Sequence, residues 1–165
     1  MRKAKYWINK LQLTPHPEGG YFREVFRSKT ELLTSGLPSR YSNNRNAVTS
    51  IYFLLKGNDV SKFHRLKSDE SWHFYAGSSV SIHIIDKAGI YRTAKLGPDP
   101  DKDMYFQYTI EHDHWFGATV DLSDSYALVG CTVAPGFDFE DFEIAERSTL
   151  LEEYPEHSVI IDKLT

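Results

Sequence analysis

The sequence has little cysteine, no long apolar run and no excess of basic residues. Because Cys131 is its only cysteine, no internal disulfide bond can form, which fits a reducing compartment. No stretch approaches the roughly 20 apolar residues of a membrane-spanning helix, and no apolar run of signal-peptide length follows the basic N-terminus. With 19 Lys and Arg against 23 Asp and Glu, the formal net charge of −4 argues against a nucleic-acid-binding protein. We therefore expect a cytoplasmic protein with neither a membrane nor a nucleic acid as partner.

The chain does have the length and apolar content of a folded protein. Of its 165 residues, 41% are hydrophobic and 25% are charged, which excludes a disordered chain. It contains no repeat, linker or low-complexity tract, so we interpret residues 1–165 as one domain. Aromatic residues reach 14%, and because aromatic rings fit pleated surfaces, this content favours a β-rich fold.

Short apolar segments separated by turn residues predict a mainly β architecture. The expected strands span residues 21–27, 48–55, 60–66, 71–76, 80–85, 90–96, 104–110, 115–122 and 126–134. Strands this short and closely spaced indicate a sandwich or a barrel rather than alternating strands and helices. The polar stretch 28–46 is interpreted as a long loop.

Helices are expected only near the two ends of the chain. The apolar residues of segment 4–11 have the spacing of one helical face. A further helix is expected after residue 136, with Thr149 and Glu152 as a capping box. Val159, Ile160 and Leu164 suit a short final helix.

The most informative segment is 63–77, which carries His64, Glu70 and a closing Gly77. The six residues between Glu70 and Gly77 resemble the first motif of the cupin superfamily. That motif has histidines near positions 63 and 65, where this chain has Phe63 and Arg65. Segment 111–116 resembles the second motif but lacks its proline, glycine and final histidine. The resemblance therefore implies a cupin that departs from the usual metal site of three histidines and one glutamate.

A closer resemblance covers nearly the whole chain. Blocks 16–24, 50–55, 64–77 and 130–137, in the correct order, resemble the fifth cupin-like group, formerly labelled a domain of unknown function. This resemblance implies an all-β fold: a double-stranded β-helix, or jelly-roll cupin barrel, with short flanking helices, usually a homodimer. It reaches more distantly to sugar-nucleotide epimerases of the deoxyhexose pathways, whose barrels need no metal. We therefore expect a small polar ligand, such as a sugar or nucleotide sugar, and no required cofactor.

The expected catalytic residues are His64, Glu70 and Tyr75. A neutral imidazole beside a carboxylate is a ready general base, because its pKa lies close to neutral pH. His64 is predicted as that base, with Tyr52 or Tyr75 as the acid.

The expected ligand-binding residues begin with Glu18, Tyr21 and Arg23, at a barrel mouth. The arginine would fork onto a carboxylate or a phosphate, and strand alternation places Tyr21 and Arg23 on one face. The remaining expected members are Ser50, Tyr52, Arg65 and Trp115.

Two alternatives stay open. In the first, His64, Glu70, His73 and His114 hold a divalent metal, since imidazoles and carboxylates are its common ligands. Strand alternation already separates Glu70 from His73, which makes His73 the weakest member. In the second, the chain is a non-catalytic module that senses a metabolite and signals through its dimer partner. Cys131 is interpreted as a small buried packing residue.

Overall fold

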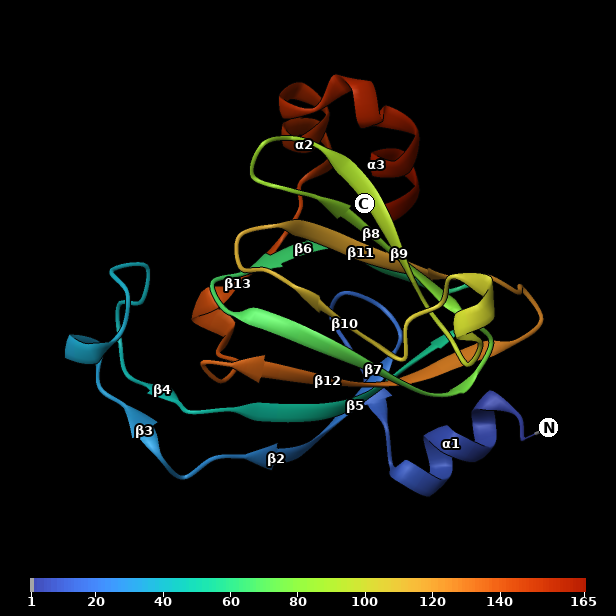
Figure 1. Ribbon diagram of the computed structural model, residues 1–165, viewed down its shortest axis with the longest axis horizontal. Coiled ribbons are helices and arrows are strands. Elements are labelled where there is room, and N and C mark those ends of the chain that lie inside the picture. The colour runs from blue at the N-terminus through green and yellow to red at the C-terminus, as the bar shows by residue number, and fades with distance from the viewer. Residues whose placement is uncertain (1) are drawn as a thin grey trace.

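Residues 2–165 are described by a computed structural model in which two antiparallel sheets face each other (Figure 1). The six-stranded sheet has the order β1 (Thr14–Pro15), β2 (Tyr21–Arg27), β5 (Thr49–Lys56), β12 (Tyr126–Ala134), β7 (Asp69–Gly77), β10 (Gln107–Ile110). The five-stranded sheet has the order β13 (Phe142–Ile144), β6 (Val60–Leu66), β11 (Trp115–Val120), β8 (Val80–Ile85), β9 (Tyr91–Leu96). From β5 onward the chain passes repeatedly between the two sheets, which is the jelly-roll arrangement that the family resemblance implies.

The main hydrophobic core fills one end of the space between the sheets. Alternate residues of the strands point inward, as the period of two requires. Trp72, Ile82 and Phe116 are among the largest side chains fully buried there. At the other end of the sandwich the same inward-facing rows of β2, β5 and β7 carry polar residues, and there the core gives way to a cavity.

Helices cover the outer faces of both sheets. Helix α1 (Ala4–Leu11) packs its apolar side on the outer face of the six-stranded sheet, where Trp7 Nε1 donates a hydrogen bond of 2.7 Å to Tyr126 Oη. Helices α2 (Arg147–Glu153) and α3 (Ser158–Leu164) cover the five-stranded sheet (Figure 1). No helix of residues 2–165 is long and apolar enough to cross a membrane.

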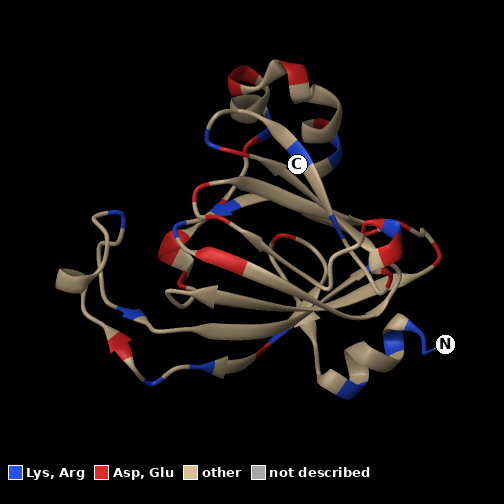
Figure 2. Cartoon of the chain, in the orientation of Figure 1, with Lys and Arg blue, Asp and Glu red and all other residues tan. Residues whose placement is uncertain are grey.

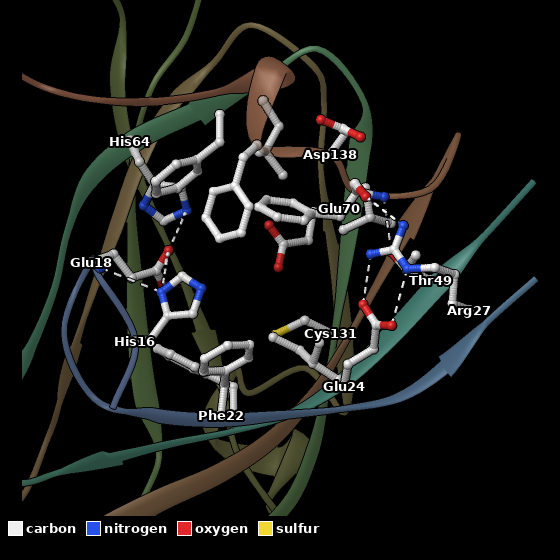
Figure 3. Close-up of a pocket in the computed structure, with 17 residues that line it drawn as sticks. His16, Glu18, Phe22, Glu24, Arg27, Thr49, His64, Glu70, Cys131 and Asp138 are labelled. Atoms are coloured by element: carbon white, nitrogen blue, oxygen red, sulfur yellow. Dashed lines mark hydrogen bonds and ion pairs between the residues drawn. The ribbon is translucent and has the colours of Figure 1, made fainter. Parts of the chain in front are cut away.

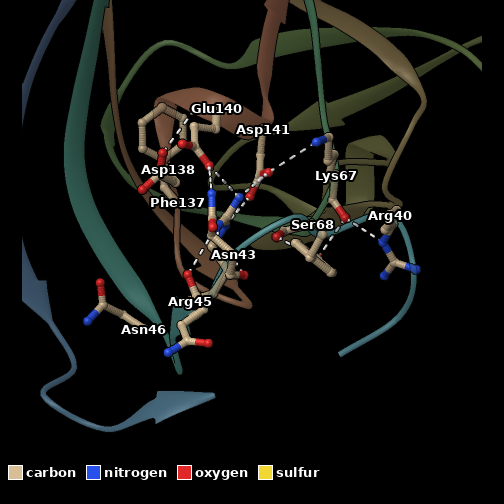
Figure 4. A network of polar contacts seen from close by, with 12 residues as sticks. Arg40, Asn43, Arg45, Asn46, Lys67, Ser68, Phe137, Asp138, Glu140 and Asp141 are labelled. Carbon is tan, nitrogen blue, oxygen red and sulfur yellow. Dashed lines mark hydrogen bonds and ion pairs between the residues drawn. The ribbon is translucent and has the colours of Figure 1, made fainter. Parts of the chain in front are cut away.

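Segment 28–46 is not only a loop, because it contains the small hairpin of β3 (Glu31–Leu32) and β4 (Arg45–Asn46) and the 3-10 turn η1 (Thr34–Gly36). This arm is tied to the barrel by Arg45, whose guanidinium donates hydrogen bonds of 2.6 and 2.7 Å to the Asp141 carboxylate (Figure 4). Both side chains are 2% exposed. This bidentate ion pair joins β4 to the 3-10 turn η3 (Phe139–Asp141), two segments far apart in the chain whose contact the sequence pattern does not predict.

The prediction for residues 136–152 is wrong in two respects, the start of the helix and its cap. The chain forms the 3-10 turn η3 (Phe139–Asp141) and then β13, which pairs with β6 and adds an edge to the five-stranded sheet. Helix α2 starts only at Arg147, and Glu146 occupies its N-cap position. Thr149 is therefore inside the helix, and the predicted capping box does not exist. Figure 2 shows the charged residues of this region, which lie mainly on loops and helices.

Candidate functional site

A cavity of about 260 Å³ lies between the sheets. Its walls come from β2, β5, β6, β7 and β12, and residues 137–142 border it on one side (Figure 3). Five phenylalanine rings supply much of the apolar lining: Phe22, Phe53, Phe137, Phe139 and Phe142. The polar side chains that reach it are His16, Glu18, Glu24, Arg27, Thr49, His64, Glu70 and Asp138.

Strand β2 presents to the cavity the face opposite to the predicted one. Phe22 and Glu24 line the cavity, whereas Tyr21 packs under α1 and Arg23 Nη1 donates a 3.3 Å bond to Gln12 Oε1 outside. The prediction that Tyr21 and Arg23 face the cavity is therefore wrong. The alternation was assigned correctly, but sequence alone did not show which face of the strand turned inward.

Arg27 reaches the cavity because the pairing of β2 with β5 shifts between Glu24 and Phe26. Four of the five N–H donors of its guanidinium have partners there. It donates bonds of 3.0 and 2.7 Å to the two oxygens of Glu24, a bond of 2.9 Å to Asn46 Oδ1 and one of 3.0 Å to the carbonyl oxygen of Phe137. Sequence reasoning assigned no role to this residue.

Glu18 is positioned by a tight turn between β1 and β2. Gly19 has φ of 113°, which only glycine adopts readily, and a Cβ there would overlap the Val60 carbonyl oxygen. The Glu18 carbonyl accepts a 2.8 Å bond from Lys62 N–H, which ties the turn to β6. The Glu18 carboxyl is thereby held against β6, where it accepts a 2.8 Å hydrogen bond from Ser61 Oγ.

His64 is the second side chain that contacts the Glu18 carboxyl. His64 Nδ1 donates to the Lys62 carbonyl oxygen at 2.7 Å, so in the neutral ring Nε2 carries the lone pair. His64 Nε2 lies 3.2 Å from Glu18 Oε2. Burial raises the pKa of Glu18 and lowers that of His64. These directions favour a neutral pair in which one proton, carried by the Glu18 carboxyl, is shared with His64 Nε2.

His16 completes this group, although the sequence pattern assigned no role to it as an individual residue. Its Nδ1 accepts a 3.3 Å bond from Glu18 N–H and lies 3.5 Å from Glu18 Oε2. Nδ1 is therefore unprotonated, and burial lowers the His16 pKa. The available signal was its place two residues before Glu18, in a block that resembles the family's opening motif.

Glu70 is the second buried carboxyl group of the cavity and, in Figure 3, points toward its centre. Glu70 is 7% exposed and forms no ion pair within residues 2–165. Burial, the largest effect, raises its pKa to about 7, opposed by nearby His64 and by the thiol of Cys131 and the indole of Trp72. Trp72 Nε1 is close enough to lower this pKa but is buried without completing a hydrogen bond.

The structure brings three of the predicted residues together at the cavity, namely Glu18, His64 and Glu70. The rest lie elsewhere. Tyr75 and Tyr52 contact each other, with ring centroids 6.0 Å apart, on the outer face of the six-stranded sheet. Ser50 lies on that face as well, bonded to Thr132 at 3.2 Å. Tyr75 lies on the outer face of β7, whereas Glu70 lies on the inner face that borders the cavity. The prediction that Tyr75 lies beside Glu70 and His64 is therefore wrong.

Arg65 and Trp115 form a separate pair away from the cavity. The Arg65 guanidinium lies 4.4 Å from the Trp115 ring centroid and 2.8 Å from Glu143. Trp115 packs in the cluster beneath α2 and α3. Both were predicted to bind ligand, but both point to the opposite face of the five-stranded sheet from His64 and neither lines the cavity.

The four residues of the alternative metal site do not meet. His73 pairs with Gln107 on the outer face of its sheet, and His114 is buried near Asp86 and Arg92 at the end of β11. Across residues 2–165 no three or more His, Cys, Asp or Glu side chains are arranged to hold a metal ion. The predicted ligand set is therefore wrong, and the cavity residues do not fit the metal centre typical of cupins.

Comparisons with known proteins agree with this architecture. The family model described as "Cupin superfamily (DUF985)" matches residues 5–145. An uncharacterized protein of Saccharomyces cerevisiae, YML079W, is 28% identical over 143 residues, which cover 81% of this chain and 71% of the yeast protein. The crystal structure of protein SO0799 from Shewanella oneidensis is 40% identical, covers 100% of this chain and 98% of its own, and has a TM-score of 0.89.

A more distant likeness concerns the fold alone. Oxalate decarboxylase from Bacillus subtilis is 15% identical with a TM-score of 0.55, and the match covers 92% of this chain and 36% of that enzyme. The likeness supports a cupin barrel and carries no information about activity at this level of identity.

Proposed function

The chain belongs to the DUF985 family of the cupin superfamily, and from this premise we propose that its cavity binds a small polar metabolite, such as a sugar or nucleotide sugar, and transfers a proton on it without a required metal. The observation that carries the proposal is the contact of 3.2 Å between His64 Nε2 and Glu18 Oε2 at the cavity wall. The phenylalanine rings supply an apolar wall against which the carbon skeleton of such a ligand packs.

The pair of His64 and Glu18 has the properties of a proton-transfer group. The Lys62 carbonyl and Ser61 hydroxyl fix its orientation, so little reorganisation is needed when a ligand enters. Opposite pKa shifts bring the acid and the base toward similar proton affinity. We assign the transfer to this pair and the orientation of the ligand to Glu70.

The test begins with a thermal-shift screen of hexoses, deoxyhexoses and nucleotide sugars, since a bound ligand stabilises the folded chain. Proton NMR in deuterated water then follows exchange of ligand C–H groups. We expect exchange with the wild-type chain, a loss of about 100-fold or more in His64→Gln, and unchanged exchange in Glu143→Gln, which alters an exposed ion pair. Binding without exchange would contradict the catalytic proposal and favour the metabolite-sensing module. No stabilisation by any member would contradict the proposed ligand class.

We further propose that the chain forms a homodimer through the outer face of the six-stranded sheet. Large side chains are exposed there, with Phe26 at 54% and Tyr75 at 52%. Light scattering during gel filtration tests this. We expect a dimer that the double substitution Phe26→Glu, Tyr75→Glu converts to a monomer, and that Val159→Glu on α3 leaves intact. A monomeric wild type, or a dimer that survives the double substitution, would refute the proposal.

A further inference from the structure

The charges around the cavity are unbalanced. Four carboxyl groups line it, from Glu18, Glu24, Glu70 and Asp138, and Arg27 is the one Lys or Arg side chain among its lining residues. Both imidazoles are pushed toward their neutral forms by burial, which lowers their pKa values. The lining therefore holds more carboxyl groups than permanently charged cations, even though it contains two histidines.

The single guanidinium is largely committed to partners within the chain. Both oxygens of Glu24 and two further acceptors, Asn46 Oδ1 and the Phe137 carbonyl, take up four of the five N–H donors of Arg27. A phosphate or carboxylate that entered the cavity would meet, among the described lining residues, one Lys or Arg side chain, already paired with Glu24, and would face Glu70 and Asp138. This weighs against anionic ligands, including the diphosphate of a nucleotide sugar.

Glu70 is in the opposite situation. Glu18 has Ser61 and two imidazoles as partners, whereas Glu70 is only 7% exposed, points into the cavity and has no cationic partner among the described residues. A buried carboxylate gains most from a partner that brings a positive charge and hydrogen-bond donors.

The rest of the wall suits the same kind of ligand. Phenylalanine faces carry negative electrostatic potential and attract ammonium groups within about 6 Å of the ring centroid. Phe22, Phe53 and Phe142 line the same cavity as Glu70. An aromatic wall beside a buried carboxyl group without a cationic partner is chemically suited to an organic cation.

We propose that the cavity selects a small ligand that carries a protonated amine, with the ammonium group on the Glu70 carboxylate and the carbon skeleton against the phenylalanine rings. This inference rests on the proposed role of the cavity as a small-molecule site. It replaces a general polar ligand by an amine-bearing one, such as an amino sugar in place of a nucleotide sugar.

A pH dependence follows from the groups that surround Glu70. They are His64 from β6, Glu18 from the turn before β2, Cys131 from β12 and Trp72 from β7 itself. With its pKa at about 7, the empty site holds its proton about half of the time at neutral pH. An ammonium group favours the ionised carboxyl, so its binding releases a proton and strengthens as pH rises from about 6 to about 8.

The experiment compares propylammonium, 1-propanol and propionate, which share one skeleton and differ in charge. Each is titrated into the full chain and followed by amide NMR shifts of the cavity residues. We expect propylammonium to bind at least about tenfold more tightly than propanol, and propionate to bind most weakly. Glu70→Gln should reduce the affinity for propylammonium to that for propanol. Glu143→Gln should leave the affinities for all three compounds unchanged.

Each result is decisive. Equal binding of propylammonium and propanol, or tightest binding of propionate, would overturn the amine inference and leave the cavity as a small-molecule site. An absence of shifts with propylammonium would also overturn it, and the screen with the His64→Gln variant would still test the proposed function independently. The comparison in the wild-type chain needs no variant, so it holds even where Glu70→Gln does not fold.

Discussion

Glu70 couples the stability of the chain to pH. Its pKa is about 7 in the folded chain against an ordinary value of 4.5, so between these values the folded state binds a proton that the unfolded state has lost. Its contribution to the free energy of unfolding is complete below about pH 4.5 and is lost as pH rises through about 7, on the order of 3 kcal/mol in total. His16 and His64 act in the reverse direction, because burial lowers their pKa values.

The difference between wild type and Glu70→Gln isolates this effect, since the histidines are common to both. We expect urea unfolding at a series of pH values to show a rising difference in the free energy of unfolding, variant minus wild type. This difference should increase by about 3 kcal/mol between about pH 4.5 and about pH 8. Glu143→Gln, which alters an exposed carboxyl group, should run parallel to wild type above about pH 5. A pH-independent difference for Glu70→Gln would show that its carboxyl is ionised in the folded state.

Single residues were where sequence reasoning was weakest. Residue types and motif positions identified Glu18, His64 and Glu70, because each lies in a block that resembles a family motif. Alternation separated Tyr21 from Phe22 correctly but did not say which faced inward. That choice depends on α1, which covers the outer face and buries Tyr21 there, and such packing between distant segments has no local signature.

The turn between β1 and β2 controls the site through its backbone. Gly19→Ala forces a residue with a side chain into φ of 113° and against the Val60 carbonyl. We expect a loss of about 2 kcal/mol or more in the free energy of unfolding, together with displacement of Glu18 from His64, visible as a change in the ¹⁵N shift of His64 Nε2. Gly36→Ala is the matched control, because open space surrounds that position.

The Gly36 substitution should stay within about 1 kcal/mol of wild type. Equal losses in the free energy of unfolding for the two substitutions would mean that the turn adjusts to a side chain at residue 19. Glu18 would then be held by its contacts with β6 alone.

At the scale of elements the sequence was informative. Helix Ala4–Leu11 and strands β2, β6, β8 and β12 have the predicted bounds, because each has a clear apolar period and ends at turn residues. β13 was missed, since three residues at a sheet edge carry too little pattern, and its existence depends on pairing with β6. The β3–β4 hairpin was missed for the same reason, and its arm is held by the distant Asp141.

The whole molecule extends beyond the segment that its family model covers. The match ends at residue 145, yet Leu150, Ile161 and Leu164 of the final helices are at most 1% exposed and pack on Phe63 and other residues of the barrel. Burial of three such side chains contributes about 5–9 kcal/mol, which is comparable to the total stability of a typical domain.

A chain that ends at residue 145 should therefore fail to fold cooperatively and should aggregate, as measured by thermal unfolding and light scattering. Val159→Asp changes a side chain of α3 that is 86% exposed, and this variant should unfold as wild type does. A truncated chain with a sharp transition near that of wild type would show that the barrel is stable without its helical cover.

Cys131 offers a direct way to observe the cavity. It is the only thiol in the sequence, and its side chain lies on the cavity wall beside Glu70. A small alkylating reagent can modify the chain at no other cysteine, and it reaches this one only through the cavity mouth or by transient opening of the barrel. At a fixed pH, the rate of Cys131 alkylation therefore reports how easily a small molecule reaches the cavity. A compound that occupies the cavity should lower this rate, whatever reaction the chain performs.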